Sequence, residues 1–202
     1  MADLAQVIVN VALLGFQLYA VLNPISVIPT FMSLMGDRGK DEKAVAVRRA
    51  SLYAAALMAV FAVLGAVILG FFNVSIASLR FGGGILLMVI AIDMLSGLSR
   101  TKMLESTEEA LIVPIATPLL VGPGTITTLI VMAATHGVVM TLAASGIASL
   151  LVYLTLRSGE LLLEVAGKNV VRGVGRFMSV IIASISAEMI HSALLEWGLF
   201  AR

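Results

Sequence analysis

The sequence has no cysteine, few charged residues and few aromatic residues. The absence of cysteine excludes disulfide bridges, iron–sulfur clusters and thiol catalysis. Only 12% of the residues are charged, and a formal net charge of +1 lacks the basic excess that a nucleic-acid partner would require. No pair of His or Cys residues has metal-ligand spacing, so the sequence predicts no metal. We also expect no other cofactor.

Hydrophobic residues, in contrast, make up 60% of the chain. Apolar runs of about 20 residues, the length that a helix needs to cross a bilayer, recur from one end to the other. We expect six spans, within residues 4–33, 50–72, 81–98, 111–134, 138–156 and 177–200. The intervening residues 36–49, 99–110 and 157–176 are expected to be polar connections. The sequence therefore predicts an all-α, polytopic protein embedded in a lipid bilayer.

Four of the five prolines lie in two similar windows, Asn23-Pro24-Ile25-Ser26-Val27-Ile28-Pro29 and Thr117-Pro118-Leu119-Leu120-Val121-Gly122-Pro123-Gly124. Proline lacks a backbone N–H and clashes with the preceding turn, so each window is expected to break its helix. Asn23 or Thr117 would then cap a new helix through its side-chain oxygen, with proline at the first helical position. We expect broken helices in the first and fourth spans.

The two windows belong to a repeat that covers the whole chain. A shift of about 95 residues superposes the windows and also aligns three later landmarks, Asn73 with Asn169, Arg80 with Arg176 and Asp93 with Glu188. Each half has three spans, so the second half would enter the membrane from the opposite side. The predicted organisation is an inverted pair of three-helix repeats, residues 1–98 and 111–202, joined by a cytoplasmic connection at 99–110.

The basic residues predict the orientation. Of the 13 Lys and Arg residues, all except Arg80 and Arg202 fall in the three connections that this topology places on one side. The positive-inside rule makes that side cytoplasmic. We therefore expect a multi-pass protein of the cell (inner) membrane with both termini outside the cytoplasm.

Inverted repeats whose helices are interrupted at matching positions are typical of secondary transporters, in which the substrate binds near the midplane between the repeats. The N-terminus of a helix offers unpaired N–H groups and a partial positive charge, which suit a carboxylate. We predict a substrate site made of the two helix starts and of nearby hydroxyl and glycine residues: Asn23, Pro24, Ser26, Thr30, Thr117, Pro118, Gly122, Gly124 and Thr125.

Two carboxyl groups, Asp93 and Glu188, are expected near the middle of the third and sixth spans. A carboxylate at that depth costs about 3 kcal/mol or more unless it is protonated, paired or facing water. Each is a candidate to carry a coupling proton or to bind a substrate ammonium group, or else to bond a neighbouring helix or cap a helix end. The alternative functions are an intramembrane hydrolase that uses this pair as acid and base, an exporter of other small metabolites, and a channel or scaffold.

The two proline signatures, together with Gly83-Gly84-Ile85-Leu86-Leu87 and Asp93-Met94-Leu95, resemble the MarC family of bacterial and archaeal membrane proteins over essentially the whole chain. The resemblance implies six spans and, for its SnatA-type members, proton-driven transport of glycine, alanine and similar amino acids. Glu188 departs from the family pattern, which commonly has an uncharged polar residue there. We expect a non-enzymatic symporter working by alternating access, with a small amino acid, a proton and the bilayer as partners, and with a homo-oligomer left open.

Overall fold

The computed structural model describes residues 2–36, 38–96 and 120–199. Within these ranges every regular element is helical, which confirms the all-α prediction. The helices are α1 (Ala2–Leu22), α2 (Pro24–Met35), α3 (Lys40–Phe71), α4 (Ile76–Ser96), α5 (Pro123–His136), α6 (Val138–Arg157) and α7 (Gly159–Glu196).

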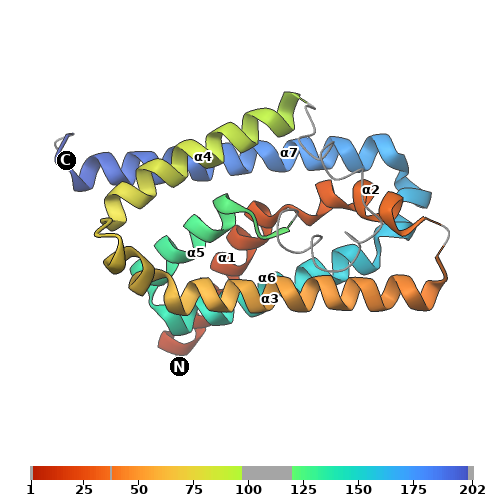
Figure 1. The fold of residues 1–202 in the computed structure, drawn as a ribbon, viewed down its shortest axis with the longest axis horizontal. Helices are drawn as coiled ribbons and strands as arrows, with labels where there is room; N and C mark the ends of the chain where they lie inside the picture. Colours follow the sequence, from red (N-terminus) through yellow and green to blue (C-terminus); the bar gives the residue numbers. More distant parts are fainter. Residues whose placement is uncertain (1, 37, 97–119, 200–202) are drawn as a thin grey trace.

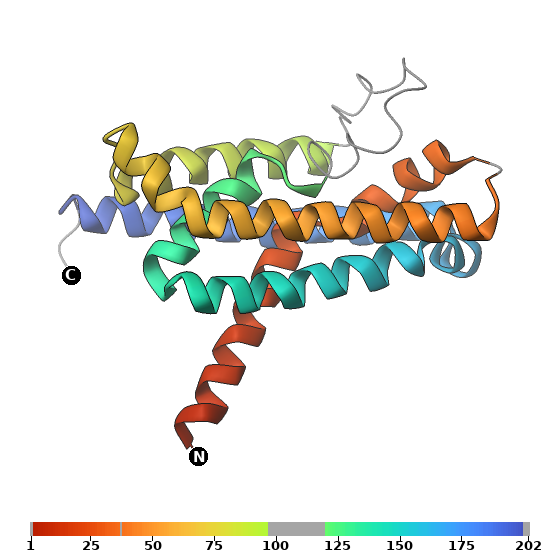
Figure 2. The same ribbon diagram turned by 60° about the horizontal axis from the view of Figure 1, so that its bottom comes forward.

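Four long helices form the body of the molecule. In Figure 1, α3, α4, α6 and α7 run along the long axis, with α4 packed on α7 and α3 packed on α6. The shorter α2 packs on α7, and α5 lies against both α3 and α4. Helix α1 packs on α6, and its N-terminal end projects from the bundle (Figure 2).

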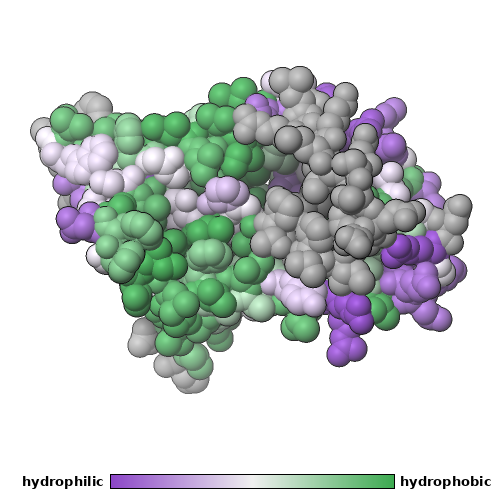
Figure 3. Space-filling model, in the orientation of Figure 1, coloured by the Kyte–Doolittle hydropathy of each residue, from purple (hydrophilic) through white to green (hydrophobic). Residues whose placement is uncertain are grey.

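Five of the described helices are long and apolar enough to cross a membrane, over Leu4–Leu22, Lys40–Phe71, Ile76–Ser96, Val138–Arg157 and Gly159–Glu196. The surface on the left of Figure 3 is largely apolar. Helix α5 has only 14 residues, and the residues before Leu120 that would complete the fourth span lie outside the described ranges. The chain is thus a multi-pass membrane protein, and the sixth span stays a prediction.

The predicted break in the first span is confirmed. Helix α1 ends at Leu22 and α2 begins at Pro24, while Asn23 between them has a left-handed backbone with φ 43° and ψ 56°. Asparagine is among the few non-glycine residues that tolerate this conformation. The predicted cap is wrong, because Asn23 makes no side-chain hydrogen bond to the start of α2. A capping side chain requires an extended backbone, which Asn23 does not have.

The second window begins its helix at its last proline. Helix α5 starts at Pro123, with Gly122 in an extended conformation before it. The start that we predicted at Thr117 and Pro118 lies outside the described residues, as does the connection 99–110.

Two of the predicted connections are mostly helical. Helix α3 already begins at Lys40. The carboxylates of Asp41 and Glu42 in its first turn stabilise the helix by their attraction to the positive end of its dipole. The segment 157–176 is helical except near Ser158 and at Gly167, whose φ of 79° breaks α7 into two helices and suits glycine alone. Hydropathy predicts only the part of a helix that lies in lipid. Backbone hydrogen bonds extend these two helices beyond the apolar residues, so the connections are shorter than predicted.

These two segments meet at one end of the bundle. Lys43 Nζ lies 3.0 Å from Glu160 Oε1, which joins the start of α3 to the start of α7. Polar surface gathers at this end, on the right of Figure 3. The basic residues of 36–49 and 157–176 had predicted that these two connections share one side.

Candidate functional site

The break between α1 and α2 is buried beside two other helices, α4 and α7. Asn23 is 3% exposed. Its Nδ2 donates to the backbone carbonyl oxygen of Gly175 in α7 at 3.4 Å and lies 3.9 Å from the sulfur of Met94 in α4. Asn23 in the first window therefore contacts α4, which belongs to the first half of the chain, and α7, which belongs to the second half. A site between the two halves requires such contacts.

The carbonyl of Gly175 defines which way the Asn23 amide points. A carbonyl oxygen can only accept a hydrogen bond, so the NH₂ group of Asn23 must face it and Oδ1 must face away. Oδ1 is buried, and none of the described residues donates a hydrogen bond to it. Leaving a buried acceptor unpaired costs about 1–3 kcal/mol. Oδ1 can therefore accept a hydrogen bond from a further donor, and an ammonium group is one such donor.

Helix α2 approaches α7 closely beside this amide. A Cβ atom on Gly175 would collide with the hydroxyl oxygen of Ser26 and would lie in tight contact, at 3.3 Å, with the Cα of Ser26. Ser26 is half-buried, and its backbone N–H already donates to the carbonyl oxygen of Asn23 at 3.1 Å. Pro24 is buried and has no N–H to offer. The start of α2 therefore has fewer free N–H groups for a carboxylate than the sequence predicted.

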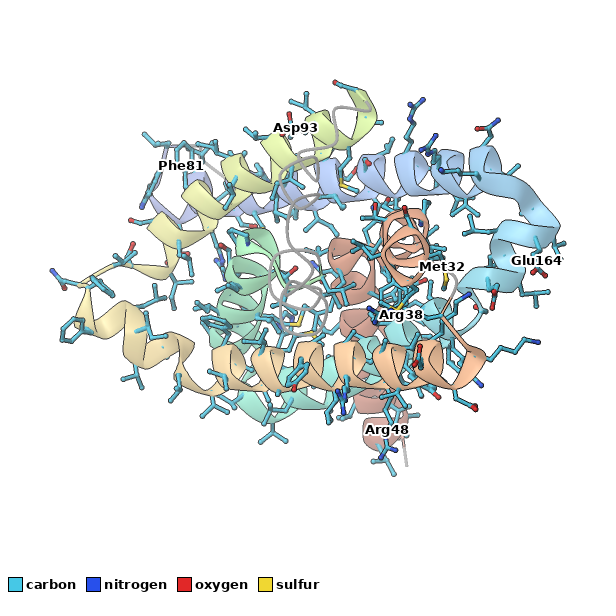
Figure 4. All side chains as sticks on the ribbon, turned by 45° about the vertical axis from the view of Figure 1, so that its right-hand side comes forward. Met32, Arg38, Arg48, Phe81, Asp93 and Glu164 are labelled. Atoms are coloured by element: carbon cyan, nitrogen blue, oxygen red, sulfur yellow. The ribbon has the colours of Figure 1, made fainter. Side chains whose placement is uncertain are left out.

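Asp93 lies on α4 immediately before Met94, the residue that contacts Asn23. The residue is half-buried, and its Oδ2 atom is fully buried. Figure 4 shows Phe81 near the beginning of α4 and Asp93 near its end. The carboxyl group predicted to carry a proton thus belongs to the same turn of helix as a contact of Asn23.

The start of α5 lies in the same buried core as the Asn23 break. Leu22 and Val27, on either side of the first break, share one hydrophobic cluster with Leu120 and Val121, which precede α5. Helix α1, which ends at this break, also packs on α5, so residues of both windows belong to one buried core. A substrate site made by both windows stays a prediction.

The predicted site residues of α5 differ in their surroundings. Gly124 is buried, and the space beside it is filled by Leu87 and Ile90 of α4. The hydroxyl of Thr125, 3% exposed, donates to the carbonyl oxygen of Leu120 at 3.4 Å, which leaves its lone pairs available. Gly122 is half-buried, as is Thr30 in α2.

Glu188 and Asp93 are not brought together. Ser186 of α7 donates to the carbonyl oxygen of Gly84, and α4 and α7 run antiparallel from this contact. Along α4, Asp93 is roughly 13 Å from Gly84, whereas Glu188 on α7 is only two residues from Ser186, which bonds Gly84. The two carboxyl groups are therefore far apart along the bundle. Glu188 is exposed on the outside of α7 and accepts a hydrogen bond from Ser192 at 3.3 Å.

Sequence reasoning missed Gly175 and Met94 as parts of the site. The small residues Gly175, Ser179, Ala183 and Ala187 recur every four positions, which predicts a close helix contact at Gly175 but does not place that glycine in the site. In the described ranges, no three His, Cys, Asp or Glu side chains group closely enough to hold a metal ion.

Comparison with known proteins gives consistent matches. The family model described as MarC family integral membrane protein matches residues 6–198. The chain is 33% identical to a UPF0056 membrane protein of Methanocaldococcus jannaschii over 188 residues, 88% of this chain and 92% of that protein. It is 34% identical to a UPF0056 membrane protein of Pyrococcus horikoshii over 184 residues, 88% and 90% of the two chains. It is 32% identical to the UPF0056 membrane protein YvbG of Bacillus subtilis over 191 residues, again 88% and 90%. No solved structure matches the chain.

Proposed function

Because this chain belongs to the MarC family of integral membrane proteins, we propose that it is a proton-coupled secondary transporter of small neutral amino acids such as glycine and alanine. One observation carries the proposal: the helix break at Asn23 places a buried acceptor, Oδ1, without a donor among the described residues, between α4 and α7. A broken helix with an unmatched polar group inside a membrane bundle is the arrangement that substrate sites of secondary transporters use.

In the proposed complex, the ammonium group of the amino acid donates to Asn23 Oδ1. The carboxylate is bound by the N–H groups at the start of α5, where Pro123 and Gly124 begin the helix. Asp93, one residue from Met94, carries the coupling proton. The close approach of Ser26 to Gly175 leaves little room beside the amide, which favours a substrate with a small side chain.

The packing of the helices supports alternating access between inverted repeats. Helix α2 packs on α7, and its counterpart α5 packs on α4; α3 and α6, which are also counterparts, pack on each other. Such an exchange of partners is what a two-fold relation between halves predicts. In the proposed cycle one half rocks against the other, in a cell membrane with both termini outside.

The proposal is tested by uptake of radiolabelled glycine and alanine into liposomes that contain the purified protein, with and without an inward proton gradient. We expect saturable, gradient-dependent uptake that falls at least tenfold in Asn23→Gly and loses its gradient dependence in Asp93→Asn. Asn23→Gly keeps a residue that accepts the left-handed backbone, so it removes the amide without straining the break. Folded protein with no flux above that of empty liposomes would refute the proposal.

The same experiment separates two rivals. An exporter of other small metabolites would show no saturable uptake of these amino acids but would release its own substrate. An intramembrane hydrolase would use Asp93 and Glu188 as acid and base, and their separation along α4 and α7 counts against it.

A further inference from the structure

Helix α7 carries an unusual outward face. The stretch from Arg176 to Glu196 is about 30 Å long, which equals the thickness of the hydrocarbon core of a bilayer. Between Phe177 and His191 the exposed residues lie at helical spacings and so form one stripe. We call this stripe the polar face of α7, after its three polar side chains; it comprises Phe177, Val180, Ile181, Ser184, Ala187, Glu188 and His191.

Two ionisable side chains lie within this face: Glu188 near the middle of the stretch, and His191 about one turn closer to Glu196. Glu188 is about 12 Å along the helix from Glu196, which marks one end of the stretch by its ion pair with Arg80. Glu188 accepts a hydrogen bond from Ser192 of its own helix. In the part of the chain that the structure describes, no other helix donates to Glu188 or bonds the exposed His191. Lipid tails offer neither group a hydrogen-bonding partner.

The other long helices show what a lipid-facing surface of this protein looks like. The exposed stripe of α4, the counterpart of α7 in the repeat, is apolar over Gly82, Ile85, Val89 and Ile92. The exposed side chains in the middle of α3 and α6 are apolar too, for example Val63 and Leu150. Contact with lipid explains those faces but does not explain Glu188 and His191.

We propose that the polar face of α7 binds the polar face of α7 in a second copy of this chain. A two-fold axis along the membrane normal brings the same residues together from both copies, so a self-complementary pair is satisfied twice. Glu188 accepts and His191 donates, and the two lie on one side of the helix with a difference in depth of about 4.5 Å. Glu188 of each copy can therefore bond His191 of the other.

The small residues of the face fit this arrangement. Ser184 and Ala187 flank Glu188 and allow two helix backbones to approach closely, as small residues do in membrane helix pairs. The face thus supplies donor, acceptor and clearance by itself. A partner of another sequence would have to bring its own matching groups, whereas a second copy already has them. The inference is independent of the transported substrate.

Absence of cysteine makes a direct test possible. We expect Ala187→Cys to give a disulfide-linked product of twice the monomer mass when membranes are treated with a mild oxidant. The matched control, Val89→Cys on the exposed face of α4, should stay monomeric. No product from Ala187→Cys, equal products from both variants, or a product of another mass would each overturn the proposal.

A second measurement tests the pairing itself. Single-molecule photobleaching measures the fraction of dimers in liposomes at different protein-to-lipid ratios. We expect the ratio at which half of the protein is dimeric to be at least tenfold higher for Glu188→His than for the parent. The double variant with Glu188→His and His191→Glu exchanges the two groups and should restore the fraction. An unchanged dimer in Glu188→His, or no recovery in a double variant whose helical circular dichroism matches the parent, would also overturn the proposal.

Discussion

Arg80 of α4 and Glu196 of α7 form an ion pair, with 3.0 Å between Nη1 and Oε2. Arg80 also donates to the hydroxyl of Thr135 at 2.7 Å, so three helices are joined at this end of the bundle. Lys43 and Glu160 form the corresponding pair at the opposite end. In each pair a residue of the first half bonds a residue of the second half. In the proposed rocking motion the two halves separate at one end of the bundle while they stay together at the other, so each open state breaks one ion pair and keeps the other.

Loss of either ion pair should shift the direction in which the site opens. We expect Glu196→Gln to raise several-fold the rate at which Ser26→Cys reacts with an impermeant maleimide from the outside, and Glu160→Gln to lower it. Since the glutamates are half-exposed, each change should alter the free energy of unfolding by less than about 1 kcal/mol. Equal labelling in both variants would contradict a two-state exchange.

Asn23 should matter more for binding than for stability. Asn23→Gly removes the hydrogen bond to Gly175 but also removes the buried Oδ1, whose unpaired state is costly, so we expect a change in unfolding free energy within about 1 kcal/mol. Asn23→Ala should cost about 1–2 kcal/mol more, because alanine is strained in the left-handed region. Thermal unfolding in detergent checks this order. Free glycine added as a ligand should raise the melting temperature of the parent protein but not that of the Asn23→Gly variant.

Gly175→Ala should destabilise the protein, because the new methyl group collides with Ser26 where α2 meets α7. Overpacking of this kind costs about 1–3 kcal/mol. Gly173→Ala is the matched control: it lies on the same helix, and a Cβ there meets no neighbouring atom. That change should be neutral or slightly stabilising, as alanine is the better helix former. Equal melting temperatures for the two variants would contradict the close approach seen at Gly175.

Single cysteines can also test the orientation. Asn73, in the turn between α3 and α4, and Lys40, at the start of α3, are both exposed and lie at opposite ends of α3. We expect Asn73→Cys to react with an impermeant maleimide in intact cells, and Lys40→Cys to react only after the membrane is opened. The reverse pattern would place the termini in the cytoplasm.

Local chemistry explains why the main break was predictable. A proline after asparagine disfavours continuation of the preceding helix wherever it occurs, so the end of α1 at Leu22 and the start of α2 at Pro24 follow from neighbours in the sequence. The side-chain partner of Asn23 was not predictable in this way, because Gly175 is 152 residues away and becomes a neighbour only when α7 packs on α2.

The extent of the helices was predicted less well than their existence. Hydropathy located the second span at 50–72, whereas α3 begins at Lys40, and it treated 157–176 as a connection although most of it is helical. A window of apolar residues responds to lipid and says nothing of the hydrogen bonds that extend a helix beyond the bilayer. The family, which the two proline signatures and the 83–95 stretch predicted, is confirmed by the match over residues 6–198.

The sequence alone determined that this is a multi-pass helical membrane protein, because its apolar runs have no stable place outside a bilayer, and it determined where the first helix must break. Only the tertiary structure decided which side of each helix faces inward. Along α4, and along most of the membrane-spanning part of α7, apolar residues occur on every side of the helix, so periodicity does not distinguish a lipid-facing side from a packed one. For that reason Asp93 and Glu188, which align in the sequence, differ in the structure: Asp93 is half-buried beside a contact of Asn23, and Glu188 faces outward.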